Sequence, residues 1–306
     1  MQPLLKTLNS RWTLRSTHSS DDQCSLRYAL FQRGTKPLTR CVVFINGRTE
    51  WIEKNMELPE LLQLPEDCGF LTWDQRGQGA SGGARAFVRH YDDYVFDARK
   101  IIEEVIGNMP YAILAHSMGG LVAMYGCLSG ELRPSRMALC SPLFQLPQEP
   151  VPSVLAYPIA KLFSNIGLSH LRTGAGSHHK AEFARNKLTH DYQMYRLICE
   201  SPYRIPSASF GWINETFKAC NEIFRNDRIS SLSAPTLVLT PEFEEVVDPK
   251  GHHSWVTRAK KLAKVDVELS LIHGGRHELL SETLTIRDRA ILEIRRWFKD
   301  FLRTQD

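Results

Sequence analysis

The sequence lacks a long apolar run, a metal-binding cysteine spacing and a secretory leader. No apolar run in the 306 residues approaches the roughly 20 needed to span a bilayer. The seven cysteines are odd in number and form no C-x-x-C pair or Cys/His ligand spacing, which argues against a disulfide framework and a zinc site. Residues 1–6 carry no start of a signal peptide. We therefore expect a cytoplasmic protein with reduced thiols that is not secreted.

A large excess of charge is also missing. The net charge of +4 is too small for the 38 basic residues to indicate nucleic acid, and no basic-aromatic string resembles an RNA- or DNA-binding motif. Basic residues do gather late, on a stretch with apolar residues at helical spacing. Such charges are usually solvated, but a peripheral contact with anionic lipid at the inner membrane stays open. They are Arg287, Arg289, Arg295, Arg296, Lys299 and Arg303.

The most informative string is YAILAHSMGG, residues 111–120, in which an apolar strand meets a serine and two glycines open a helical stretch. This pattern indicates a nucleophile elbow, a tight strand-to-helix turn that exposes a serine hydroxyl above a sheet. The turn needs small residues two before and two after the serine, and Ala115 and Gly119 meet this need, although glycine is usual at the first position. Ser117 is therefore the candidate nucleophile. The Met118 N–H, at the positive end of the next helix, is a candidate oxyanion donor.

A serine nucleophile needs a base, which this arrangement places late in the chain, after the acid and just past a strand. The apolar run 267–272 is followed by the string HGGRHE at 273–278. His277 is the candidate base because it lies beyond the glycines, where a loop can bring an imidazole over the elbow. His273 lies at the strand end, and we assign it a structural role.

The acid that orients the base is expected in the loop 241–249, after the apolar strand 235–240. Asp248 competes there with Glu244 and Glu245. We favour Asp248, because a short side chain fixed beside Pro249 should hold one imidazole tautomer more rigidly than a glutamate.

Apolar strands alternate with helices along the chain, which predicts an α/β protein with a mostly parallel central sheet and flanking helices. An early hairpin is the expected exception to the parallel order. The predicted elements are that hairpin over 12–30, strands at 41–45, 69–73, 111–115, 137–140, 235–240 and 267–272, and an amphipathic helix over 94–106.

The alternation stops in residues 143–230, which contain clustered prolines and short helical segments but no clear buried strand. Because this region lies between two core strands, we interpret it as an inserted helical cap. The α/β-hydrolase core would then comprise residues 1–142 and 231–306.

Several strings together carry a family resemblance: NGRTE at 46–50, DQRGQGASG at 74–82, AHSMGG at 115–120, VVD at 246–248 and HE at 277–278. They resemble the bacterial lysophospholipases of the monoacylglycerol-lipase-like branch of α/β-hydrolases, within the serine aminopeptidase-type hydrolases. The resemblance is strongest to the inner-membrane-associated lysophospholipases, through G-R-x-E at 47–50, D-x-R-G-Q-G at 74–79 and L-T-H at 188–190. It implies the α/β-hydrolase fold.

The resemblance also implies a second oxyanion donor. In this superfamily the loop after the first central strand normally carries His-Gly-x-Gly, whose third residue donates an N–H. That string aligns with NGRT at 46–49, so the Arg48 N–H is the candidate partner of the Met118 N–H, although asparagine and threonine replace histidine and the second glycine. The Arg48 side chain could instead pair with Glu50 and brace the loop.

These residues predict a serine hydrolase of carboxylic esters, foremost a lysophospholipase that releases a fatty acid through an acyl-enzyme. Ser117 attacks, His277 transfers the proton, Asp248 orients His277, and the Met118 and Arg48 amides hold the oxyanion. The chemistry needs no cofactor. A metal is not expected either, since the adjacent histidines at 178–179 and 252–253 lack ligand spacing.

Other functions stay open at this point. The expected partner is a lysophospholipid or a monoacylglycerol, and the runner-up activity is a monoacylglycerol lipase or general carboxylesterase. An aminopeptidase is the third option, because a substrate amino group could bind the cap carboxylates Glu182, Asp191, Glu200, Glu215 and Glu222. Outside enzymes, the chain could be a catalytically silent hydrolase fold that only binds a ligand.

Overall fold

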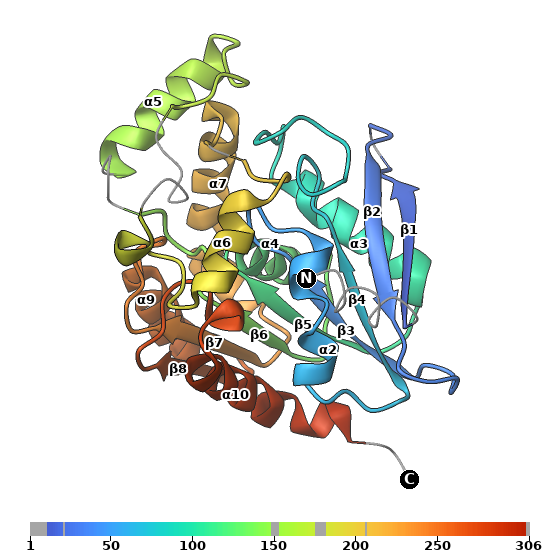
Figure 1. Cartoon of the computed structure of the whole chain (residues 1–306). Helices are drawn as coiled ribbons and strands as arrows, with labels where there is room; N and C mark the ends of the chain where they lie inside the picture. The colour runs from blue at the N-terminus through green and yellow to red at the C-terminus, as the bar shows by residue number, and fades with distance from the viewer. Residues whose placement is uncertain (1–10, 21, 148–152, 175–181, 206, 304–306) are drawn as a thin grey trace.

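The computed structural model describes residues 11–20, 22–147, 153–174, 182–205 and 207–303, and an eight-stranded sheet runs through its centre (Figure 1). The strand order is β1-β2-β4-β3-β5-β6-β7-β8. β1 and β2 form an antiparallel hairpin, β2 pairs antiparallel with β4, and the other neighbours are parallel. The strands are β1 (Trp12–His18), β2 (Ser25–Phe31), β3 (Arg40–Ile45), β4 (Cys68–Trp73), β5 (Tyr111–His116), β6 (Met137–Cys140), β7 (Thr236–Pro241) and β8 (Val267–Ile272).

Helices cover both faces of the sheet. Among the described helices, none combines the length and the apolar character needed to cross a bilayer. Their bounds are η1 (Ile52–Asn55), α2 (Leu58–Leu61), α3 (Asp92–Ile106), α4 (Met118–Leu128), α5 (Ser153–Asn165), η3 (Phe183–Arg185), α6 (Tyr192–Glu200), α7 (Phe210–Ile223), α8 (Asn226–Ser230), α9 (Lys250–Leu262), η4 (Leu279–Ser281) and α10 (Leu284–Leu302).

The sheet separates two apolar cores because successive side chains of a strand point to opposite faces. On β3, Val43 joins the core formed with α3, α4 and α9, whereas Val42 and Phe44 join the core formed with η1, α2 and α10. All residues of β3 and β4 are buried, as expected for parallel strands covered on both faces. The strands predicted from the sequence, the early hairpin and the amphipathic helix all form, which confirms the predicted α/β architecture.

Between β6 and β7 the described residues contain α5, η3, α6, α7 and α8 but no named strand. This is the region that the sequence analysis interprets as a cap. Its helix α7 packs against α5 on one side and against α4 of the core on the other. The inserted helices therefore lie next to the helix that follows the elbow (Figure 1).

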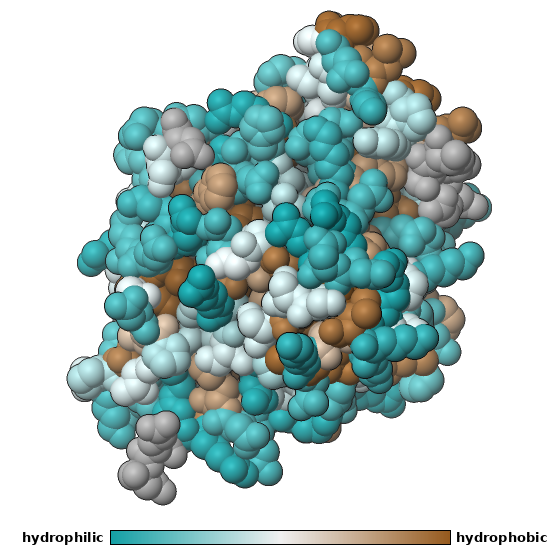
Figure 2. Space-filling model, turned by 180° about the vertical axis from the view of Figure 1, so that it is seen from behind, coloured by the Kyte–Doolittle hydropathy of each residue, from teal (hydrophilic) through white to brown (hydrophobic). Residues whose placement is uncertain are grey.

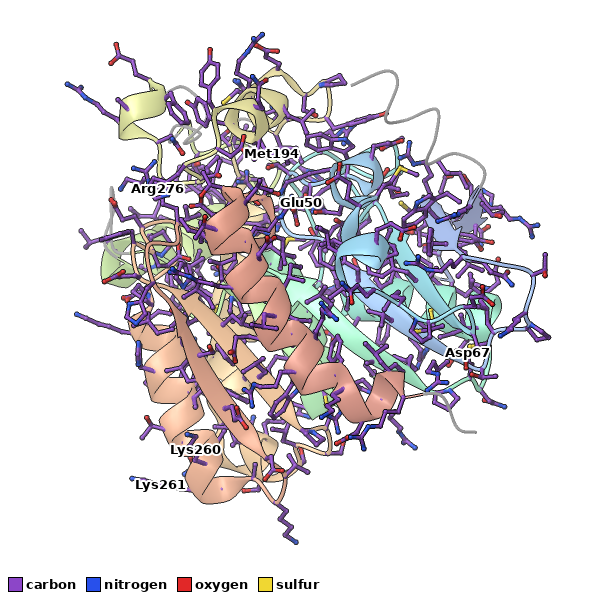
Figure 3. All side chains as sticks on the ribbon, turned by 60° about the horizontal axis from the view of Figure 1, so that its bottom comes forward. Glu50, Asp67, Met194, Lys260, Lys261 and Arg276 are labelled. Carbon is purple, nitrogen blue, oxygen red and sulfur yellow. The ribbon has the colours of Figure 1, made fainter. Side chains whose placement is uncertain are left out.

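Residues that follow parallel strands gather at one end of the molecule. In Figure 3, Glu50 and Arg276, which follow β3 and β8, lie at the upper end. Asp67, which precedes β4, and Lys260 and Lys261, which precede β8, lie lower. Functional sites of parallel α/β sheets form at the carboxyl ends of the strands. The upper end in Figure 3 is therefore where the predicted site residues should meet.

Candidate active site

β5 ends in the sharp turn that the elbow motif predicts. Ser117 has φ 51° and ψ −118°, a strained backbone conformation for a serine, and α4 begins at the next residue. A Cβ on Gly119 would lie 2.1 Å from the carbonyl oxygen of Ile45, so only glycine fits there. Met118 occupies the first helical position, where an N–H has no partner within the helix. The turn thus presents both a hydroxyl and a free donor.

His277 lies within hydrogen-bond reach of Ser117. Its Nε2 is 3.0 Å from the Ser117 Oγ, and both residues are buried. The backbone carbonyl of His277 accepts a hydrogen bond of 2.7 Å from the Ser141 hydroxyl, which fixes the loop between β8 and η4. The structure therefore brings together the predicted nucleophile and the predicted base.

The acid beside His277 is Glu244. Its carboxylate oxygens lie 2.9 and 3.0 Å from His277 Nδ1, and one of them also accepts the Val246 N–H at 2.8 Å. Burial opposes ionisation of this carboxyl, but the attraction of His277 and these hydrogen bonds outweigh it, so the pKa of Glu244 is lowered. A charged carboxylate at this place holds the proton on Nδ1 and leaves Nε2 free to accept one from serine.

Asp248 does not occupy the position that the sequence analysis gave it. Its carboxylate accepts hydrogen bonds of 3.0 Å from the Gln145 side chain and from the Lys250 N–H, at the start of α9. The expectation that a short side chain beside Pro249 is held more rigidly was wrong in its premise. Glu244 is rigid because it is buried and bonded to backbone N–H groups, and it lies closer in sequence to the end of β7.

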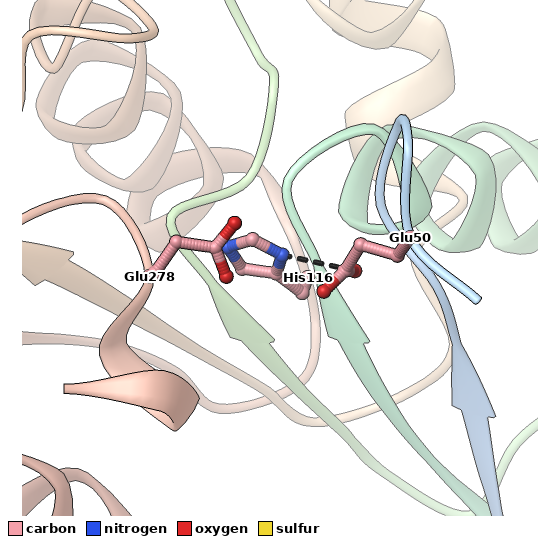
Figure 4. Close-up of side chains that lie close together, drawn as sticks. All are labelled: Glu50, His116 and Glu278. Carbon is pink, nitrogen blue, oxygen red and sulfur yellow. Dashed lines mark hydrogen bonds and ion pairs between the residues drawn. The ribbon is translucent and has the colours of Figure 1, made fainter. Parts of the chain in front are cut away.

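A buried charge network next to His277 was not expected from the sequence, and Figure 4 shows three of its members, Glu50, His116 and Glu278. His116, the residue before the nucleophile, places its ring 4.9 Å from that of His277, centroid to centroid. Its Nδ1 faces Glu50 at 3.1 Å and its Nε2 faces the His277 carbonyl at 3.2 Å. The Lys54 ammonium bonds both Glu50 and Glu278. The one available signal was the four-residue spacing of Glu50 and Lys54.

This network is electrically balanced. Both ring nitrogens of His116 face acceptors, which requires an imidazolium with two N–H donors. Burial lowers the pKa of His116, but Glu50 and Glu278 more than offset this, and the net shift is upward. Glu50, His116 and Glu278 lie close enough to resemble a metal-ligand set, yet the Lys54 ammonium and the His116 imidazolium together already neutralise the two carboxylates. The group anchors the loop between β8 and η4 that carries His277, here called the histidine loop.

The glycine-rich loop 74–82 supports the segment after β3 that carries Arg48. Asp74 accepts hydrogen bonds of 2.8 Å from the N–H groups of Ile52 and Ala80, and a Cβ on Gly79 would lie 2.1 Å from its carboxylate carbon. Gln78 accepts the Thr49 N–H and lies 3.8 Å from the Met118 sulfur. The loop thus joins the segment that follows β3 to the elbow.

Arg48 lies between these fixed points, but its side chain does not pair with Glu50, whose partners are Lys54, His116 and the Gly47 N–H. The guanidinium of Arg48 lies over the Trp212 ring of α7, 5.2 Å from its centroid. The bracing alternative considered for Arg48 is therefore not observed. Its backbone N–H remains the candidate second oxyanion donor.

The profile described as "Serine aminopeptidase, S33" matches residues 36–284, most of the chain. The chain belongs to this family. The S33 profile covers both parts of the core and the insert, so it includes the elbow, Glu244 and His277.

Named relatives and solved structures agree with this family membership. The chain is 27% identical over 270 residues to a probable lysophospholipase L2 of Haemophilus influenzae, covering 83% of this chain and 82% of that protein. It is 26% identical to the monoglyceride lipase of Homo sapiens, covering 88% and 86%. A soluble variant of monoglyceride lipase from Saccharomyces cerevisiae superimposes with a TM-score of 0.78 at 22% identity, covering 95% and 96%. The fold is that of the α/β-hydrolases.

In this S33 protein the string 188–190 binds the insert to the histidine loop. The Leu188 carbonyl accepts the Glu278 N–H at 2.9 Å, and the Thr189 hydroxyl donates to the Ser281 carbonyl at 2.8 Å. His190 Nδ1 lies 2.9 Å from the Glu282 carboxylate. The L-T-H string at 188–190 therefore has a structural role, because it links the insert to Glu278, the residue next to His277.

The paired histidines do not form a metal site within the described residues. His252 is buried, with Nδ1 2.9 Å from the Thr240 hydroxyl and Nε2 2.7 Å from the Pro142 carbonyl. His253 is exposed. Residues 178 and 179 lie outside the described part of the chain.

Proposed function

We propose that the protein is a serine hydrolase that cleaves the carboxylic ester of single-chain lipids, with lysophospholipids as the main substrates and monoacylglycerols as the alternative. The observation that carries this proposal is the continuous set of contacts from Glu244 through His277 to Ser117 at a nucleophile elbow. The names of the relatives, lysophospholipase and monoglyceride lipase, support the choice of lipid esters.

The first half of the reaction forms an acyl-enzyme. Ser117 Oγ attacks the ester carbonyl carbon while His277 Nε2 accepts the hydroxyl proton, and Glu244 stabilises the resulting imidazolium. The N–H groups of Met118 and Arg48 donate to the oxyanion. Collapse of the tetrahedral intermediate breaks the ester bond, and His277 gives its proton to the departing alcohol oxygen.

Water completes the cycle. His277 removes a proton from a water molecule, which attacks the acyl-enzyme carbonyl, and the second tetrahedral intermediate collapses to release the fatty acid. The proton returns to Ser117 Oγ. No step in this sequence calls for a cofactor, because serine, imidazole and backbone amides supply the nucleophile, the proton carrier and the oxyanion donors.

The size of a lipid's apolar part favours single-chain substrates. Each buried methylene is worth about 0.8 kcal/mol, so moving one chain of roughly 16 carbons from a bilayer into water costs on the order of 10 kcal/mol. A pocket for one acyl chain offsets most of that cost for a lysophospholipid or a monoacylglycerol. A diacyl lipid would leave its second chain in water.

An aminopeptidase activity is less well supported. Four of the five insert carboxylates that could bind a substrate amino group already have partners. Asp191 caps α6 by accepting the Met194 N–H, and Glu200, Glu215 and Glu222 form ion pairs within the insert. A non-catalytic binding role is also disfavoured, since the serine, histidine and acid lie together in reacting geometry.

The proposal is tested by labelling and by product release. A fluorophosphonate probe should label wild-type protein at Ser117, and Ser117→Ala should not be labelled. Fatty acid release from lysophosphatidylcholine and from monoacylglycerol should exceed release from a diacyl phospholipid, in mixed micelles at matched surface concentration. Ser117→Ala and His277→Ala should each lose nearly all activity, on the order of a million-fold for such paired residues.

Two outcomes would contradict the proposal. Labelling and turnover that persist in Ser117→Ala would place the nucleophile elsewhere. Turnover of aminoacyl amides without release of fatty acid from any lipid would remove the lipid substrates. A ligand-binding role would be indicated if the folded wild type neither reacted with the probe nor hydrolysed a short-chain ester.

We also propose a peripheral contact with lipid, made through α5. Exposed apolar residues lie along α5 and just beyond its C-terminal end. They form a brown area at the upper right of Figure 2. An exposed apolar patch of this kind suits a surface that enters a membrane interface. The residues are Leu155, Ile159, Leu162 and Ile166.

The late basic helix is a weaker lipid-binding surface than its composition implies. Arg296 forms ion pairs with Glu268 at 2.8 Å and with Glu293 at 3.1 Å, and Arg295 bonds the Gln63 side chain. The apolar face of α10 is buried in the core, with Ile294 and Phe298 fully covered. These contacts support the view that the charges of α10 are solvated surface groups.

A further inference from the structure

Arg48 lies near the nucleophile. Its neighbour Gly47 packs directly against the elbow, and its neighbour Thr49 is linked to the elbow through Gln78. A Cβ on Gly47 would lie 3.0 Å from His116 Nδ1 and 3.2 Å from the His116 carbonyl oxygen. On the other side, the Thr49 N–H donates to Gln78, whose amide touches Met118. Arg48 is therefore fixed next to the residues that flank Ser117 in sequence.

Arg48 as a whole is half-buried, but two of its guanidinium nitrogens are shielded from solvent and have no anionic partner among the described residues. Its Nε and Nη2 atoms are shielded from solvent and make no hydrogen bond in the described part of the chain. No ion pair of Arg48 is found among the described residues, and the carboxylate nearest in sequence, Glu50, is bonded to Lys54 and His116. The contact that remains is with the face of Trp212.

This environment is unfavourable for a cation but does not discharge it. Burial, together with the like charge of Arg172, lowers the pKa of Arg48 to about 10, so the side chain is still protonated at neutral pH. The Trp212 ring offsets only part of the lost hydration. A buried charge without a partner costs far more than an exposed one, and an anion placed against it recovers that cost.

The chemistry of the free donors identifies the type of anion. A guanidinium offers N–H groups in a planar fork that matches two oxygens of a phosphate or carboxylate. Of the lipids considered for this site, a monoacylglycerol is uncharged, whereas a lysophospholipid carries a phosphodiester joined to its ester through glycerol. An ester bound at Ser117 would bring that phosphodiester to the surroundings of the elbow.

We infer that the Arg48 guanidinium binds the phosphodiester of a lysophospholipid while Ser117 attacks its ester, and so selects phosphorylated over uncharged single-chain lipids. This inference rests on the proposed lipid esterase function. It assigns the Arg48 side chain a role in specificity, separate from the oxyanion role of its backbone N–H. The same guanidinium could also meet free phosphate, so the test has to distinguish the two sources.

The kinetic test compares kcat/KM for lysophosphatidylcholine and for monoacylglycerol of the same acyl chain. In Arg48→Met the ratio of the two should fall about 30-fold, which is about 2 kcal/mol at 1.4 kcal/mol per tenfold. Arg48→Lys should lie between, because an ammonium keeps the charge but loses the fork. The matched control is Arg196→Met, a charge loss on exposed α6 where Arg196 already pairs with Glu200, and it should keep the wild-type ratio.

An inhibition test avoids dependence on the turnover of the lipids themselves and on the stability of the variants. With wild-type protein, a non-hydrolysable ether lysophospholipid should inhibit short-chain ester hydrolysis about 30-fold more strongly than the matching alkylglycerol. Inorganic phosphate should not compete at the concentration where the ether lipid does. Inhibition by phosphate as strong as that by the ether lipid would make this a free-phosphate site and overturn the inference.

The failure of the inference and the failure of the proposed function give different results. Equal inhibition by the two ether lipids, or an unchanged ratio in a folded Arg48→Met, would reject Arg48 as a phosphodiester ligand while leaving the esterase intact. An equal loss on both substrates would indicate that Arg48 only braces the loop against Trp212. If wild type hydrolyses short esters but neither lipid, the lipid function itself fails and the inference fails with it.

Discussion

Glu244 shows how a single side chain determines the assignment of a catalytic site. The loop after β7 offers three carboxylates within five residues, and only Glu244 reaches His277, at 2.9 Å from Nδ1. Glu245 is exposed and pairs with Lys187 at 3.1 Å. Asp248 bonds the start of α9. The three residues are similar in chemistry and differ in the direction that the loop gives them.

The first prediction reverses the ranking expected from the sequence. Glu244→Gln should lower kcat by about 10⁴-fold, because an amide no longer holds the correct imidazole tautomer or stabilises the imidazolium. Asp248→Asn and Glu245→Gln should each change kcat by less than about tenfold, since neither contacts His277. The measurement is kcat on a short-chain ester, with circular dichroism to verify folding. A critical Asp248 and a dispensable Glu244 would return the orienting role to Asp248.

At the scale of elements, α9 is the support for the loops that carry the acid. Its buried His252 donates from Nε2 to the Pro142 carbonyl, after β6, and accepts at Nδ1 from the Thr240 hydroxyl of β7. The bond at Nδ1 needs the neutral imidazole, because a protonated Nδ1 cannot accept a hydrogen bond. Burial is the main cause that lowers the pKa of His252, to about 4.

This pKa predicts a loss of stability in mild acid. The ordinary value is 6.5 and the folded value is about 4, so the contribution of His252 is complete above pH 6.5 and is lost as the pH falls towards 4. The slope is at most about 1.4 kcal/mol per pH unit in that window. In His252→Gln, the decline in the free energy of unfolding between pH 7 and pH 5 should be smaller by about 2 kcal/mol. Urea unfolding at each pH measures it.

The neighbouring histidine provides the control. His253 is exposed on the same helix, so His253→Gln should keep the wild-type pH dependence. An identical pH dependence in wild type and His252→Gln would mean that His252 does not resist protonation in the folded protein.

At the scale of the whole molecule, the insert between β6 and β7 covers part of the core and is also bonded to the loop that carries His277. It packs on α4 through α7, and it bonds the histidine loop through residues 188–190. Its outermost helix, α5, exposes an apolar surface, whereas α10 at the far end of the chain buries its own. A lipid surface approached through α5 would lie next to the insert rather than next to the basic helix.

The corresponding prediction concerns vesicle binding. Replacing Leu155, Leu162 and Ile166 together by serine should weaken binding to phospholipid vesicles at least about tenfold, since each buried leucine or isoleucine side chain is worth about 1.5–3 kcal/mol. Leu292→Ser, at an exposed leucine of α10, is the matched control and should bind normally. Sedimentation with vesicles measures both.

A lipid contact made through the basic helix α10 would give different results in the same measurement. If α10 were the lipid surface, binding would rise with anionic lipid, weaken as salt screens charges over about 10 Å, and disappear when Arg295, Arg296 and Lys299 are made neutral. Wild-type binding that requires these residues and ignores the α5 substitutions would assign the contact to α10.

Local sequence patterns were enough to predict the succession of strands and helices along the chain, the serine of the elbow and the histidine. A continuous apolar run predicts a strand where a sheet is covered on both faces, and the small residues around Ser117 are required by the turn itself. His277 was found because a single histidine lies beyond the glycines after β8.

The three-dimensional arrangement was needed to show which carboxylate meets His277, which groups anchor the histidine loop, and that Arg48 has no anionic partner among the described residues. Each depends on contacts between segments far apart in the chain, such as Glu278 with Lys54 and Arg48 with Trp212. The backbone conformation of each loop determines where such a side chain points. Burial and neighbouring charges then shift its pKa and so determine its charge. Neither the direction nor the burial of these groups is a property of their neighbours in sequence.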